Sequence, residues 1–204
     1  MNTDQFVEAV RENNRTALSR LGSSKSLYAD TMGEMDTDTV LTAAADAEHH
    51  AATTYAMWAD SADDAAVAEA FMTTASEERA HYTHIIDKLD EHEPSEQVPA
   101  IQQSLREMNG TIGRLGGFIG RTIAAEKSKE QLTGFFVGQA DPRSAQTFRE
   151  MGDDLEAQLA RATQLLADHC DTDTEWEAAL AAAGETIQTA YEKYTERLEE
   201  MGVN

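Results

Sequence analysis

Residues 41–62 read LTAAADAEHHAATTYAMWADSA, and the seam of this stretch follows alternating steps of three and four residues. Such a rhythm is typical of a helix that packs along another helix, because residues three and four positions apart lie on one side of the turn. Positions 41, 44, 51, 55, 58 and 62 hold apolar or aromatic residues, whereas position 48 holds Glu. A carboxylate on a helix seam is costly to bury unless it has a partner. Glu48 therefore predicts a polar group inside a helical protein.

The remaining sequence is also helical in pattern, and no stretch has the alternation of a strand. We expect helices over residues 4–21, 36–61, 63–91, 99–139, 141–169 and from about 175 to 201. Residues 23–36 are expected to form a connector and residues 92–98 a crossing loop. Glycines at 110, 113, 116 and 117 should loosen or break the helix over 99–139. The fold class is therefore all-α, with a central unit over 36–170, an N-terminal helix and connector over 1–35, and an amphipathic helix over 171–204.

A second misplaced carboxylate lies on the next helix, where Glu78 and His81 occupy seam positions one turn apart. The two halves of the central unit can then be compared. Glu126 lies 78 positions after Glu48, and Glu156 lies 78 positions after Glu78. Identity at this offset is sparse, but the seam carboxylates coincide and so do the turns between helices. The sequence thus predicts two similar helix pairs that share a carboxylate-lined interior.

Two helix pairs with such carboxylates resemble the rubrerythrin branch of the ferritin-like superfamily, over about residues 36–170. The resemblance rests on Glu48, Glu78, His81, Glu126 and Glu156, and on Tyr55 seven residues after Glu48. It implies a ferritin-like four-helix bundle that holds two metal ions, with iron expected first and manganese or zinc as alternatives. The five residues other than Tyr55 would be the metal ligands. Glu130 is a further candidate ligand, and Tyr55 is a candidate catalytic residue with core packing as the alternative role.

The chain departs from that family in two places. Leu159 stands where a second histidine would match His81, so one metal would lose its nitrogen ligand. The single Cys170 excludes the four-cysteine iron module of full rubrerythrins. The first hypothesis is a di-metal protein that reduces peroxide or O2, or oxidises Fe(II), and takes electrons from an unknown donor. The alternative is a metal-free or single-metal bundle with a structural or interaction role, and iron storage in a cage is a third hypothesis.

The composition limits the partners. The 204 residues include 16 Lys plus Arg and 38 Asp plus Glu, which gives a formal net charge of -22. Such a surface repels phosphates, so nucleic acids and anionic membranes are excluded as expected partners. Acidic excess with only five lysines resembles proteins of extreme halophiles, whose salt would screen the repulsion. An acidic mesophilic protein is the alternative.

Location and assembly are predicted from what the sequence lacks and from its last helix. No apolar run reaches the roughly 18 residues that would span a membrane, and no basic-flanked leader is recognisable, so we expect a cytoplasmic protein. The last helix carries Trp176, Tyr191 and Tyr194 on one face. This face either packs on its own bundle or forms a dimer contact, and we expect a homodimer.

Overall fold

The computed structural model of the chain describes residues 1–203, which form helices and contain no strand. The all-α prediction is therefore confirmed for this part of the chain. The helices are α1 (Thr3–Asn13), α2 (Arg15–Leu21), α3 (Ser24–Asp30), α4 (Thr37–Asp60), α5 (Ala65–Ile86), α6 (Ala100–Glu107), α7 (Thr111–Gly138), α8 (Pro142–His169) and α9 (Asp173–Glu200).

The long helices begin at side chains that accept hydrogen bonds from the first turn. Asp36 accepts from the Thr39 N–H at the start of α4, and Asp64 and Asp141 do the same for α5 and α8. These bonds satisfy N–H groups that have no partner inside the helix, and a carboxylate also suits the positive end of the helix dipole. Hydrogen bonds from Thr39 lower the pKa of Asp36. The start of the helix expected over residues 141–169 is confirmed, with Asp141 as the N-cap and Pro142 as the first helical residue.

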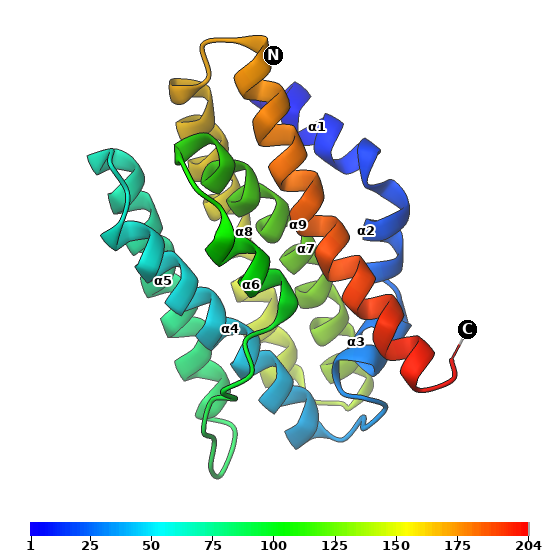
Figure 1. Cartoon of the computed structure of the whole chain (residues 1–204). Helices are drawn as coiled ribbons and strands as arrows, with labels where there is room; N and C mark the ends of the chain where they lie inside the picture. Colours follow the sequence, from blue (N-terminus) through cyan, green and yellow to red (C-terminus); the bar gives the residue numbers. More distant parts are fainter. Residues whose placement is uncertain (204) are drawn as a thin grey trace.

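The long helices pack as two pairs with α9 added to one of them. α4 lies against α5, and α7 lies against α8, while contacts of α5 with α8 join the pairs. α9 runs along α7, and α1, α2 and α3 follow one another beside α9 (Figure 1). The helices expected at the two ends of the chain are therefore packed onto the central helices.

Two short features of the N-terminal region differ from the prediction. The helix expected over residues 4–21 is interrupted at Asn14, whose buried side chain donates to the Val10 carbonyl and accepts from Gln188 of α9. Part of the expected connector is helical as α3, with Leu27 and Ala29 buried. Seven residues make too few turns to reveal a periodicity, which explains why the sequence pattern missed this helix.

The glycines predicted to break the helix over 99–139 have different effects. The chain does leave the helix between α6 and α7, where Gly110 has φ of 72°. A positive φ of this size is readily adopted only by glycine. In contrast, α7 continues through Gly113, Gly116 and Gly117, so these three glycines do not break the helix. At Gly116, and also at Gly120, the backbone of α9 lies against α7. A Cβ at either glycine would overlap a carbonyl oxygen of Ala179 or Ala183.

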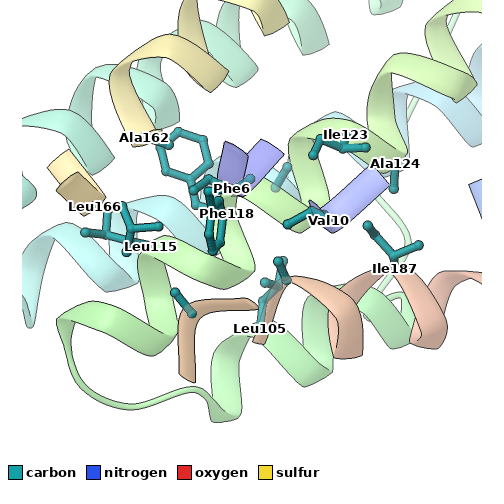
Figure 2. Close-up of a cluster of buried hydrophobic side chains, with 14 of the residues drawn as sticks. Phe6, Val10, Leu105, Leu115, Phe118, Ile123, Ala124, Ala162, Leu166 and Ile187 are labelled. Atoms are coloured by element: carbon teal, nitrogen blue, oxygen red, sulfur yellow. The ribbon is translucent and has the colours of Figure 1, made fainter. Parts of the chain in front are cut away.

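Apolar side chains gather in two clusters along the helices. The larger cluster has members in each of the helices α1 to α9. Figure 2 shows members from α1, α6, α7, α8 and α9, among them Phe6, Leu105, Phe118, Leu166 and Ile187. The smaller cluster includes residues of α3, α4, α5, α7 and α8. Along α4, Ala45 belongs to the smaller cluster and Ala51 to the larger one. Glu48 lies between them, so a polar layer separates two apolar ones.

No helix among residues 1–203 combines the length with the apolar character that crossing a lipid bilayer requires.

Candidate metal centre

Three of the predicted ligands meet in the polar layer. Glu48 of α4 and Glu78 and His81 of α5 are at most 2 % exposed. One donor atom from each residue lies within 4.8 Å of the others, so this group could hold a metal ion. In residues 1–203 it is the one group of three or more such side chains with this geometry. The α4–α5 packing explains the meeting, because Glu78 and His81 share the face of α5 that α4 covers.

Both carboxylates of this group are paired with basic side chains of α7. The Lys129 ammonium forms an ion pair with Glu48 Oε1. The Arg121 guanidinium donates to Glu78 through Nη1 and Nη2, at 2.7 and 2.8 Å, and so binds both carboxylate oxygens. Gln158 of α8 also donates from Nε2 to Glu78 Oε1, at 2.9 Å. Bidentate arginine–carboxylate contacts are among the strongest polar contacts in proteins.

The two ring nitrogens of His81 lie between two carboxylates. Nδ1 is 3.3 Å from Glu48 Oε2, and Nε2 is 2.9 Å from Asp154 Oδ2. Because an ionised carboxylate only accepts hydrogen bonds, both nitrogens must donate, and the ring is then a cationic imidazolium. Burial lowers the pKa of His81, but the hydrogen bond to Glu48 and the charges of Glu48 and Glu78 outweigh burial, so the pKa is raised.

The carboxyl groups respond to the same neighbours. Burial alone would raise the pKa of Glu48, but the Lys129 ammonium and the hydrogen bond with His81 hold it well below its usual range. The pKa of Glu78 is raised, because burial and the Glu48 charge outweigh the Arg121 guanidinium. Glu48 is therefore the more strongly ionised member of this carboxylate pair.

The layer balances its own charge. Glu48, Glu78 and Asp154 supply three carboxylates, and Lys129, Arg121 and His81 supply three cations. A pair of divalent ions requires several free carboxylate ligands. Here each oxygen of Glu48 and Glu78 already contacts a base, and the imidazolium has no free lone pair. The donor set thus matches one ion at most, and only if these contacts are released, so it does not fit a pair of ions.

The other three predicted ligands lie elsewhere. Glu126 faces α1 and pairs with Arg11, 2.8 Å away. Glu130 is exposed and pairs with Lys127 on its own helix. Glu156 is exposed on α8 and lines a groove between α1 and the α7–α8 pair. None of the three joins Glu48 and Glu78.

Tyr55 lies in the larger apolar cluster, next to the polar layer. It is fully buried, and its ring lies 4.8 Å from the Phe118 ring between centroids. The Arg121 guanidinium carbon is 5.8 Å from the Tyr55 ring centroid. Burial raises the pKa of the Tyr55 hydroxyl, which has no hydrogen-bond partner among the described residues. Its surroundings are those of a core residue, and its catalytic role stays a prediction.

The sequence reasoning missed Arg121, Lys129, Gln158 and Asp154 as members of the polar layer. One signal was present for the first of them. Arg121 stands between Ile119 and Ile123 in an apolar stretch, and a charge there is as misplaced as Glu48 in its own stretch. The sequence therefore indicates a buried base at position 121 in the same way as it indicates a buried carboxylate at position 48.

Comparison of the chain with protein-family models, with curated proteins and with solved structures gave no match.

Proposed function

We propose that the chain is a ferritin-like four-helix bundle, formed by α4–α5 and α7–α8, in which an ion-pair layer replaces the metal centre. It acts as a metal-independent structural or binding protein. One observation carries this proposal: every oxygen of the two most buried carboxylates is already bound by a base from the same chain. The alternative of a metal-free bundle, raised by Leu159 in the sequence, is thereby favoured over a redox centre.

Electrostatics supports this role for the layer. Buried carboxylates need either metal ions or paired cations, since isolated buried charges are very costly. A divalent ion added beside Lys129 and Arg121 would meet their repulsion, and it would also have to remove a proton from His81. The paired arrangement avoids both costs. It also favours one alignment of the helix pairs, because a shifted helix would leave charges unmatched.

The test is the metal content of the protein. We expect chain produced with added iron, manganese or zinc to contain only traces of each metal by mass spectrometry. Its thermal unfolding should not change with a chelator. Lys129→Leu is the matched variant, because it releases Glu48 Oε1 and removes one cation, and it should bind more zinc than the native chain. One tightly bound ion per native chain, with unfolding that a chelator shifts, would overturn the proposal.

A second candidate function is the metal-dependent one, in which peroxide or O2 is reduced or Fe(II) is oxidised. The observation in its favour is the convergence of Glu48, Glu78 and His81 donor atoms within 4.8 Å. A bound iron would supply the electron transfer, and these three residues would hold it. This candidate gains support if the native chain retains iron. The homodimer, the halophilic origin, the cytoplasmic location and the unknown electron donor stay predictions.

A further inference from the structure

A long surface groove lies between α1 and the α7–α8 pair. Its volume is about 1810 Å³, whereas small-molecule sites have about 300–1,000 Å³. Along α8 its wall extends from Phe148 to Gln164, which at a rise of about 1.5 Å per residue is about 24 Å. The groove is therefore larger than a small-molecule site, and its length matches about four turns of a helix.

The groove collects the residues that did not fit the metal centre. Glu126, Glu130 and Glu156, which the sequence pattern predicts as ligands, all line it. Leu159, which stands where a second histidine would match His81, lines it as well. The polar layer gives these side chains no role, whereas the groove places them on one surface.

Apolar side chains beside a glycine form part of the lining. Phe148 is buried, while Val7 and Leu159 are partly buried and pack against the larger apolar cluster. A Cβ at Gly152 would meet only the Lys129 Cβ, at 4.0 Å, so a larger side chain at this position would extend into the groove. Partly exposed apolar side chains in a groove are suited to the apolar face of an amphipathic helix.

The two walls carry an excess of unpaired carboxylates. Four lining residues form no ion pair within residues 1–203, namely Asp4 and Glu8 of α1 and Asp153 and Glu156 of α8. Of the lining bases in the same part of the chain, only Arg149 has no carboxylate partner. Such walls attract a cationic segment and repel an anionic one. A second copy of this chain, with its formal net charge of -22, is therefore disfavoured as the occupant.

We propose that the groove binds a basic amphipathic helix of a partner protein. The apolar face of that helix would lie on Val7 and Leu159, and its lysines or arginines would lie beside the carboxylates of α1 and α8. The inference rests on the binding role in the proposed function and names the chemistry of the partner. The two proposals can fail separately, because metal analysis tests the polar layer and peptide binding tests the groove.

Three synthetic peptides of about 18 residues separate binding in the groove from general attraction to an acidic protein. The first has leucines along one helical stripe and lysines on both sides of it. The second has the same composition in scrambled order, and the third has glutamate in place of lysine. In fluorescence anisotropy titrations with the full chain, the first should bind at least about tenfold more tightly than the second, and the third should not bind. Equal binding of the first two peptides, or no binding of the first, would overturn the proposal.

A bulky side chain at Gly152 should block the groove. Gly152→Tyr should weaken binding of the leucine–lysine peptide at least about tenfold, because the ring would occupy the space of the partner helix. Gly134→Tyr is the matched control, since this exposed glycine of α7 also meets no neighbouring atom within 4 Å and lies outside the groove. Circular dichroism checks that both variants fold. Unaltered affinity in folded Gly152→Tyr would contradict the assignment.

A charge variant tests the same groove without added bulk. Asp153→Asn combined with Glu156→Gln changes two exposed residues that have no ion pair, and it should weaken peptide binding about threefold to tenfold. Glu199→Gln combined with Glu200→Gln is the control, because it removes two charges at exposed positions of α9 outside the groove. Equal weakening in both double variants would mean that net charge attracts the peptide, and the proposal would be wrong.

Sedimentation of the chain without peptide tests the other possible occupant. We expect Gly152→Tyr and Gly134→Tyr to have the oligomeric state of the native chain. A dimer that is lost in Gly152→Tyr and kept in Gly134→Tyr would place a second copy in the groove and would overturn the assignment to a basic partner.

Discussion

The two helix pairs meet with opposite charge. α4–α5 contributes Glu48 and Glu78 to the layer, whereas α7 of the other pair contributes Arg121 and Lys129. If all four of these positions held carboxylates, the carboxylates would repel one another and would require cations from outside the chain. With bases on one pair, the chain supplies its own counter-charge. Similar helix pairs can thus enclose either a metal centre or an ionic contact, and a few side chains decide which.

Removal of Arg121 should have the largest effect on this contact. Arg121→Leu leaves the fully buried Glu78 without its cation, and we expect a loss of about 3–5 kcal/mol in the free energy of unfolding. Urea denaturation at fixed salt measures it. Lys127→Leu is the control, because the Lys127–Glu130 pair reaches solvent and should contribute less than about 1 kcal/mol. Equal losses in the two variants would mean that the buried pairing does not hold the helix pairs together.

The Glu48–Lys129 contact can be isolated by a double-mutant cycle. Glu48→Gln and Lys129→Met should each destabilise the protein, since each leaves a buried partner unpaired. The double variant should lose less than the two separate losses combined, by about 1–3 kcal/mol. The same urea titrations provide all four values. Additive losses would show that the two side chains do not interact in solution.

The α7–α8 pair differs from α4–α5 also in its outer neighbour α9. Gly120→Ala should destabilise the protein by about 1–3 kcal/mol, because the new Cβ would overlap the Ala183 carbonyl. Gly134→Ala on the same helix meets no atom within 4 Å and should stabilise by about 0.5–1 kcal/mol. Thermal unfolding of both variants measures the contrast. If Gly120→Ala is as stable as Gly134→Ala, α9 does not lie against α7 in this register.

The smallest expected effect is the pH dependence of His81. Its pKa is raised above the ordinary value of 6.5, so the folded chain binds this proton more tightly than the unfolded chain does. The resulting stability is complete below about pH 6.5 and is lost as the pH rises through the raised pKa. His81→Asn should unfold with a weaker pH dependence above about pH 6.5. Identical pH profiles would argue against the imidazolium.

The sequence predicted the α4–α5 side of the layer correctly for a physical reason. The α4 stripe of apolar residues fixes which face is inside, and Glu48 falls on it. Glu78 and His81 follow because two helices joined by a short turn must pack face to face. The candidate residues from this half therefore meet within one site.

The side chains that α7 contributes to the layer could not be predicted from the 78-residue offset between the two halves. Arg121 and Lys129 are eight residues apart and lie on one side of α7, while Glu126 is turned toward Arg11 of α1. The rotation of α7 is set by its glycine face, which lies on α9, a helix outside the compared repeats. The 78-residue offset compares only the two halves of the central unit and does not include α9. It therefore matches Glu126 with Glu48 in the sequence, although the two side chains do not meet in the structure.

The position of α9 also affects the order in which the chain can fold. α1, α2 and α3 begin the sequence, yet they pack against α9, which follows every other described helix. Phe6, for example, lies 5.6 Å from Trp176 between ring centroids. During synthesis on a ribosome, α1 is made well before α9, so the contacts between them form late, and contacts so distant along the chain slow folding. Until α9 has been made, the apolar side chains of α1 lack the α9 residues that they pack with in the folded chain.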